Sequence, residues 1–64
     1  MMTMNPKYKY GDIVSFKCNN KKHTGEVYII DAHGTFERPD VVSYDILVKD
    51  ENILYKHIGE DELL

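Results

Sequence analysis

Apolar and polar side chains alternate near the start of the chain, over Asp12–Cys18. Val14, Phe16 and Cys18 share one face of this segment, and the side chains between them are polar. Such alternation predicts a half-buried β-strand. Asn19–Lys22 come next, and asparagine tolerates the left-handed backbone of a hairpin turn, so we expect the chain to reverse there.

A second strand is predicted over His23–Asp31, where Gly25, Val27 and Ile29 share one face. Ile30 breaks the alternation, which indicates a β-bulge or a strong local twist close to it. A glycine inside a strand often marks a close approach of another backbone segment, and we expect this at Gly25.

The second half of the chain predicts two long strands and one short one. Thr35–Glu37 is long enough for a short strand, which must end before Pro39. Val42–Asp50 alternates most clearly and places Tyr44 inside. The turn Asp50–Asn52 leads into Ile53–Ile58, an antiparallel neighbour.

In this last strand, Leu54 and Ile58 are expected to face inward, and Tyr55 and His57 outward. Gly59 and the acidic residues after it are expected to form one helical turn. The predicted core consists of Val14, Phe16, Val27, Ile29, Ile46, Val48, Leu54 and Ile58.

These elements predict an all-β fold, a small barrel of four to five short antiparallel strands with at most one helical turn near the C-terminus. At 64 residues there is room for a single compact core. We expect residues 1–9 to form a flexible N-terminal arm and residues 10–64 to form the barrel domain.

Charge is unevenly distributed along the chain, although the net charge is only −3. Through Thr24, five lysines stand against one aspartate, a balance of +4. From Gly25 onward, three basic residues stand against ten acids, a balance of −7. Cys18 is the single cysteine, which favours a reducing, cytoplasmic location. The sequence contains no apolar run long enough to predict a signal peptide or a membrane span.

Several stretches together resemble a known group of proteins: "YGDIVSFK", "GEVYIID", "GTFE", "SYDILV" and "LYKHI". In this order they are similar to short SH3-like barrel proteins from Firmicutes and their phages or mobile elements. The resemblance extends from Tyr10 to Ile58. It implies an SH3-like barrel but carries no biochemical role with it. "GDIV" followed by "GEV" is also similar to the opening of KOW and Tudor-type barrels.

The sequence predicts neither a metal site nor an enzyme. His23, His33 and His57 lie on different elements, and no pair of them has the spacing of a zinc ligand set. Cys18 is expected to be a buried small hydrophobic residue. No phosphate-binding loop or nucleophile motif is present, so we expect no cofactor and no catalytic residue.

Outward aromatic side chains are the main functional signal, because tyrosines are favoured at recognition surfaces. We therefore predict a non-enzymatic cytoplasmic module that binds another protein. Its expected binding patch consists of Tyr28, Phe36, Tyr55 and His57. The opposing interpretation is that these rings only cover a very small core.

Two alternative functions remain open. A KOW-like nucleic-acid-binding protein would use lysines for phosphates and tyrosines for base stacking. The candidate residues are Lys7, Tyr8, Lys9, Tyr10, Lys17, Lys21 and Lys22. A self-associating protein would instead cover its apolar surplus with a second copy, and we expect the chain to be a monomer or a weak homodimer. That surplus consists of Ile13, Ile30, Leu47, Leu63 and Leu64.

Overall fold

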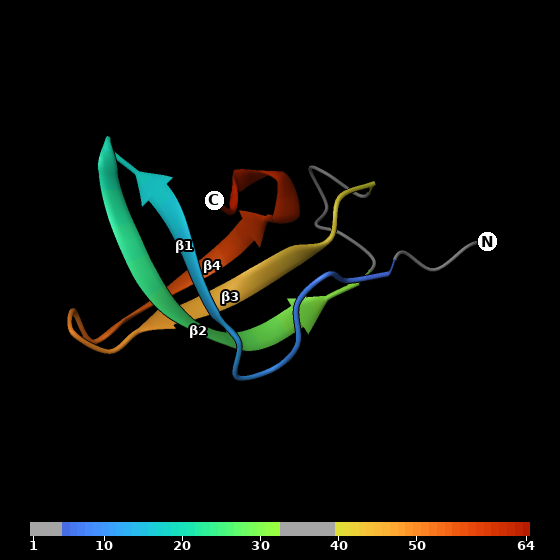
Figure 1. Cartoon of the computed structure of the whole chain (residues 1–64), viewed down its shortest axis with the longest axis horizontal. Helices are drawn as coiled ribbons and strands as arrows, with labels where there is room; N and C mark the ends of the chain where they lie inside the picture. Colours follow the sequence, from blue (N-terminus) through green and yellow to red (C-terminus); the bar gives the residue numbers. More distant parts are fainter. Residues whose placement is uncertain (1–4, 33–39) are drawn as a thin grey trace.

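The computed structural model describes residues 5–32 and 40–64, and these form one antiparallel sheet (Figure 1). The strands follow one another in the order β1-β2-β3-β4, so each pairs with its neighbour in the chain. A single 3-10 turn, η1, follows β4. The predicted all-β class and the C-terminal helical turn are confirmed, while the strand expected at Thr35–Glu37 lies outside the described residues. The elements are β1 (Ile13–Cys18), β2 (Lys21–Asp31), β3 (Ser43–Val48), β4 (Ile53–Gly59) and η1 (Glu60–Glu62).

The two hairpin turns that lie wholly within the described residues use asparagine in the left-handed region. Asn19 and Asn20 join β1 to β2 with φ angles of 54° and 63°, the sign pattern of a type I′ turn. In the turn from β3 to β4, Asn52 has φ 55°. Its N–H donates to the carbonyl of Lys49 at 3.1 Å. These turns match the twist of the strands they join.

A bulge interrupts β2, close to the predicted position. The register shifts between Val27 and Ile29, which adds one residue to β2 relative to β3. The alternation therefore reverses after Val27: Ile29 is 44% exposed and Ile30 packs against the core. The prediction that Ile29 is a core residue was wrong, because the bulge precedes it rather than following it.

A second irregularity lies between β3 and β4. The register shifts between Tyr44 and Ile46, with the extra residue in β4. His57, next to this point, has φ 60°, and its N–H donates to Oδ1 of Asp45 at 3.1 Å. Side-chain alternation read from the sequence of β4 therefore does not hold along its whole length.

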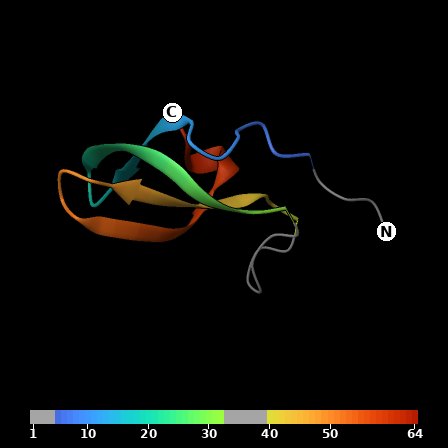
Figure 2. The ribbon, with the colours of Figure 1, turned by 90° about the horizontal axis from the view of Figure 1, so that it is seen from below.

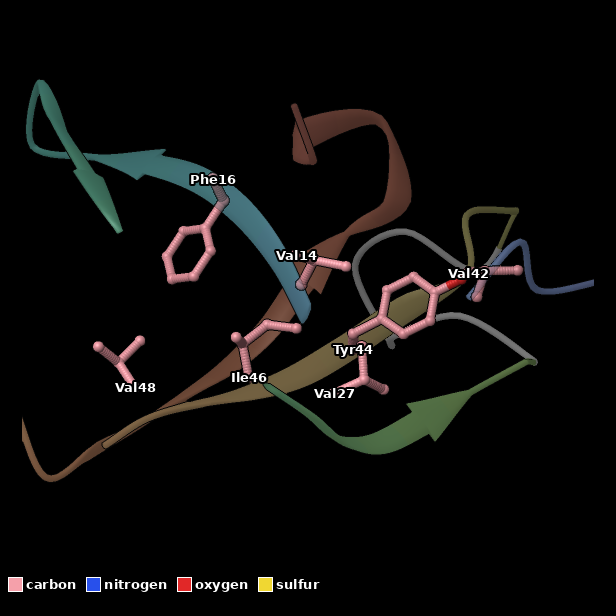
Figure 3. Packing of buried hydrophobic residues seen from close by; sticks show 7 residues of the cluster. All are labelled: Val14, Phe16, Val27, Val42, Tyr44, Ile46 and Val48. Atoms are coloured by element: carbon pink, nitrogen blue, oxygen red, sulfur yellow. The ribbon is translucent and has the colours of Figure 1, made fainter. Parts of the chain in front are cut away.

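The sheet curls so that β1 lies over β3 (Figure 2). Buried side chains of both strands belong to one hydrophobic core cluster. Figure 3 shows Val14 and Phe16 pointing from β1 toward Ile46 and Val48 on β3. Five of the eight predicted core residues are confirmed, and Tyr44 is buried as expected. The buried hydrophobic residues are Val14, Phe16, Val27, Val42, Tyr44, Ile46 and Val48.

Leu54 and Ile58 are only half-buried, so the expectation that they are enclosed was wrong. Ile58 pairs with Tyr44 and does pack against the core. Leu54 pairs with Leu47, which lies between two inward-facing residues of β3 and so points to the other side of the sheet. Leu54 therefore faces outward.

The C-terminal residues return to β1. Leu63 forms an antiparallel bridge with Phe16, and the N–H of Leu64 donates to the carbonyl of Ser15 at 2.8 Å. η1 makes this return possible, and the N–H of Glu60 fixes it to the carbonyl of Val42 at 2.8 Å. The free side of β1 is thus partly covered.

The described part of the predicted N-terminal arm is anchored to the sheet. The ring of Tyr8 meets that of Tyr44 edge to face, with centroids 5.7 Å apart. The N–H of Lys7 donates to Oε2 of Glu60 at 2.9 Å, and that of Lys9 to Oδ2 of Asp12 at 2.9 Å.

At Gly25 the backbone of β3 comes close to β2, as the position of this glycine in a strand predicts. A Cβ atom at this position would lie 2.5 Å from the carbonyl oxygen of Leu47 and 2.8 Å from Cγ2 of Ile46. Only glycine fits there without displacing backbone. In residues 5–32 and 40–64, no helix is long and apolar enough to cross a membrane.

Candidate functional site

Tyr55 lies on the core side of the sheet, so the prediction that it faces outward was wrong. It pairs with Ile46, which is fully buried, and cross-strand partners share a face. Its ring meets that of Phe16 at 5.1 Å and that of His23 at 4.9 Å between centroids. The residue is half-buried and completes one end of the core.

Of the predicted patch, the two other described residues, Tyr28 and His57, do not gather around Tyr55. Tyr28 is 57% exposed on the bulge of β2, and His57 is exposed on β4, with β3 between these two strands. Phe36 lies outside the described residues. The structure therefore does not bring Tyr55 and His57 to one surface.

A polar cluster at this end of the core consists of three side chains, His23, Glu51 and Tyr55. His23 is only 7% exposed, and its ring stacks on Phe16 at 5.4 Å. Its Nδ1 lies 2.6 Å from Oε2 of Glu51, while the hydroxyl of Tyr55 donates to Oε1 at 2.5 Å. One carboxylate thus holds both a histidine and a tyrosine.

Hydrogen bonds set the protonation of this cluster. The Tyr55 hydroxyl and the His23 ring stabilise the carboxylate and hold the pKa of Glu51 below its usual range. The same hydrogen bond to Glu51, together with desolvation, raises the pKa of Tyr55 to about 12. Near neutral pH, Glu51 is ionised and accepts both bonds, so the Nδ1 atom of His23 carries a proton and donates it.

The cluster serves to fix the turn between β3 and β4. Glu51 belongs to that turn, whereas His23 belongs to β2, so the contact ties the turn to the next hairpin. Cys18 packs against the core as predicted, but it is half-buried rather than buried. Among the residues that the structure describes, no group of three or more metal-ligating side chains occurs.

A second buried tyrosine fixes the opposite end of the sheet. The Tyr44 hydroxyl donates to Oε2 of Glu60 at 2.5 Å, the same oxygen that receives the N–H of Lys7. Burial, and then this hydrogen bond, raise the pKa of Tyr44 to about 12. The carboxylate of Glu60 joins β3, η1 and the N-terminal segment.

The face of the sheet that points away from the core, called the outer face here, carries a row of cross-strand partners that spans all four strands. Ile13 pairs with Glu26, Glu26 with Leu47, and Leu47 with Leu54. Ile13 is 69% exposed, and the two leucines are half-buried. We call these four residues the outer row. It places three aliphatic side chains on a surface where alternation predicts polar ones.

A shallow hollow lies against the outer row. It has a volume of about 200 Å³, and its lining includes Ile13, Thr24, Leu47 and Asp50. On its rim, Nζ of Lys49 pairs with Oε1 of Glu26 at 3.2 Å. Apolar and charged side chains therefore line the hollow together.

The candidate nucleic-acid residues divide between two segments, the N-terminal residues before β1 and the β1–β2 hairpin. Tyr8 packs on the core, while Tyr10 is 68% exposed, so the two rings do not form a stacking pair. Lys7 and Lys9 lie beside them in the N-terminal segment. Lys17, Lys21 and Lys22 lie on the β1–β2 hairpin, where Lys17 and Lys22 are direct cross-strand partners.

Comparisons with protein-family models, with curated proteins and with solved structures give no match to this chain. The function proposed below therefore rests on the geometry of this molecule.

Sequence reasoning missed the buried histidine and its carboxylate. His23 is in phase with Gly25 and Val27, so the alternation of β2 already placed it inward. Glu51 gave no such signal, because it belongs to a turn and reaches His23 only through the pairing of β2, β3 and β4. The outer row could be recognised only from the register of all four strands, which the sequence alone does not give.

Proposed function

We propose that this chain is a non-enzymatic, cytoplasmic protein-binding module that uses the outer row and its hollow as the binding surface. The observation that carries the proposal is that Ile13, which is 69% exposed, lines the same hollow as Leu47, across Glu26 in the outer row. Apolar side chains grouped on a surface and edged by polar groups are typical of protein interaction sites.

The arrangement of the polar clusters supports a binding role. His23, Glu51 and Tyr55 satisfy one another and stabilise a turn, so they have a structural task that accounts for their geometry. The same turn carries Lys49 and Asp50 to the rim of the hollow. The buried cluster thus holds the rim in place.

The architecture that we propose for this module is an SH3-like barrel. Its support is the order of the elements: four strands that each pair with the next, then η1, then the return of Leu63 to β1. That return gives β1 a second neighbour and brings the curled sheet toward closure. SH3-like barrels commonly bind peptides on their surface.

A partner-capture experiment with matched variants tests this proposal. The wild-type chain, Ile13→Asp and Tyr28→Asp are immobilised and exposed to cytoplasmic extract of the host, and the retained proteins are quantified by mass spectrometry. Both substitutions place a charge on an exposed side chain, but only Ile13 belongs to the outer row. We expect a specific partner to be lost with Ile13→Asp and retained with Tyr28→Asp.

The opposite pattern would overturn the proposal. A partner that is lost with Tyr28→Asp alone would move the binding surface to the bulge of β2. If Ile13→Asp retains every partner but abolishes a homodimer seen by gel filtration, the outer row is covered by a second copy of the chain instead.

A further inference from the structure

Two lysines occupy directly opposed positions on the β1–β2 hairpin. Lys17 of β1 pairs with Lys22 of β2, and both are exposed. Like charges directly opposite each other on antiparallel strands destabilise the pair. In the part of the chain that the structure describes, neither lysine side chain has an ion-pair or hydrogen-bond partner. The fold therefore tolerates a repulsion that it does not offset internally.

The lysine pair lies on the same face as the outer row. Residues at i, i+2 and i+4 of a strand share a face, so Ile13 and Lys17 are on the same side of β1. Between them, the hydroxyls of Ser15 and Thr24 lie 2.8 Å apart and bond to each other. Along the hairpin, the surface thus changes from apolar, through neutral polar, to basic.

We infer that the partner presents an extended acidic segment, with carboxylates over Lys17 and Lys22 and an apolar side chain over Ile13. The inference rests on the proposed function and adds the chemistry of the ligand. Lys17 lies four positions after Ile13, a span of about 13 Å in a strand. An extended ligand that follows β1 therefore needs its acidic and apolar residues about four positions apart.

The same face favours a protein over a nucleic acid. Three aliphatic side chains of the outer row offer nothing to a phosphate backbone, and Glu26 and Asp50 beside them would repel it. Nucleic-acid affinity rests largely on the neutralisation of phosphates by many basic groups. The chain as a whole carries a net charge of −3.

Binding of synthetic peptides to the full 64-residue chain tests the inference. The first peptide has twelve residues, with two glutamates four positions from two leucines in a Ser/Gly background. The second replaces both glutamates with glutamine, and the third keeps the composition of the first but scrambles the order. A twelve-nucleotide single-stranded DNA is the fourth probe. Affinity is measured by fluorescence anisotropy, and the contact surface by backbone amide NMR shifts.

Two charge-reversal variants separate the lysine pair from general charge. Lys17→Glu combined with Lys22→Glu removes the proposed contacts, and Lys7→Glu combined with Lys9→Glu makes the same change of charge in the N-terminal segment. We expect the first variant to bind the acidic peptide at least about tenfold more weakly. The second should change the affinity by less than about twofold.

The single substitution Lys17→Glu gives a second, independent readout. It converts a like-charge pair into an opposite-charge pair with Lys22, so the hairpin gains stability. We expect the melting temperature to rise by about 2 °C while the peptide affinity falls. Higher stability together with weaker binding cannot result from misfolding, and it marks the lysine pair as a ligand site.

Three outcomes would overturn the inference. If the glutamine peptide binds as tightly as the acidic one and both are sensitive to Ile13→Asp, the outer row still binds protein but not through charge. If the DNA binds more tightly than the acidic peptide and displaces it, the ligand class is wrong. If none of the peptides binds, the ligand chemistry inferred here is wrong, and the proposed function is then judged by partner capture alone.

Discussion

Nδ1 of His23 lies 2.6 Å from Oε2 of Glu51, although 28 residues separate them in the chain. The contact joins β2 to the turn that connects β3 and β4. His23 is almost completely buried, and burial of a polar side chain is tolerated because it is hydrogen-bonded. The pair explains how a turn made of charged residues is held in one position.

The acid stability of the chain should depend on this carboxylate. The folded-state pKa of Glu51 is lower than its unfolded value, so its contribution is complete above about pH 4.3 and is lost as the pH falls through the folded pKa. We expect Glu51→Gln to lower stability at neutral pH and to flatten this part of the pH profile. The measurement is the midpoint of urea unfolding between about pH 2 and pH 7, at steps of about half a pH unit.

The matched control for Glu51 is its neighbour Asp50, which is exposed. Asp50→Asn removes one negative charge from the same turn and should leave the acid profile close to that of the wild type. If both variants flatten the profile equally, the effect comes from the general charge of the turn and not from the contact with His23.

Ionisation of the Tyr44 hydroxyl should lower the stability of the chain at high pH. Its folded pKa of about 12 exceeds the unfolded value of about 10, so its contribution is complete below pH ~10 and is lost as the pH rises toward 12. We expect Tyr44→Phe to be less stable at neutral pH but to lose less stability across this window. Ultraviolet titration of the tyrosines, with unfolding measured in parallel, tests it. An unchanged alkaline profile in the variant would contradict this role for Tyr44.

Truncation of Phe16 should remove much of the stability of so small a domain. Its side chain is fully buried between β1 and β3 and contacts the rings of His23 and Tyr55. We expect Phe16→Ala to cost about 3–5 kcal/mol in free energy of unfolding. Ile13→Ala on the outer face of the same strand should cost less than about 0.5 kcal/mol. Equal losses for the two variants would mean that the core is misassigned.

Gly25→Ala should be strongly destabilising although it adds a single methyl group. The new atom would lie 2.5 Å from a backbone oxygen of β3, so the two strands must separate. We expect a loss of about 1–3 kcal/mol, measured by chemical unfolding. Thr24→Ala, the adjacent and exposed position, serves as the control and should cost less. A neutral Gly25→Ala would show that β2 and β3 are not in close contact here.

Zinc and chelators should leave the melting temperature unchanged. Within the described ranges, no three metal-ligating side chains converge, and structural zinc requires four ligands. Thermal unfolding with zinc and with EDTA is the measurement. A shift of several degrees would reveal ligands that come together in a way the sequence did not indicate.

The strands were predictable because their signals are local. Alternation over β1 placed Val14 and Phe16 correctly, and the asparagines marked the turns. The position of Gly25 in a strand predicted the close approach of β3. Each of these inferences needed only neighbours in the sequence.

The site was less predictable because it depends on register. One extra residue in β2 turns Ile29 outward and Ile30 toward the core. One extra residue in β4 breaks the alternation between Tyr55 and His57, so the two side chains do not share a face. Alternation locates a break only to within a residue or two, but a shift of one residue moves a side chain to the other face. The patch predicted around Tyr55 was therefore misplaced, and the outer row was not seen.

The pairing of each strand with its neighbour in the chain also sets the order in which the molecule can assemble. The three hairpin contacts form between nearby segments, so little loop entropy opposes them. The bridge from Leu63 to Phe16 joins the two ends of the sheet and forms only when the strands between them are in place. We therefore expect the local hairpins to form first and the contact between β1 and the C-terminal residues to form late, in the slow step of folding.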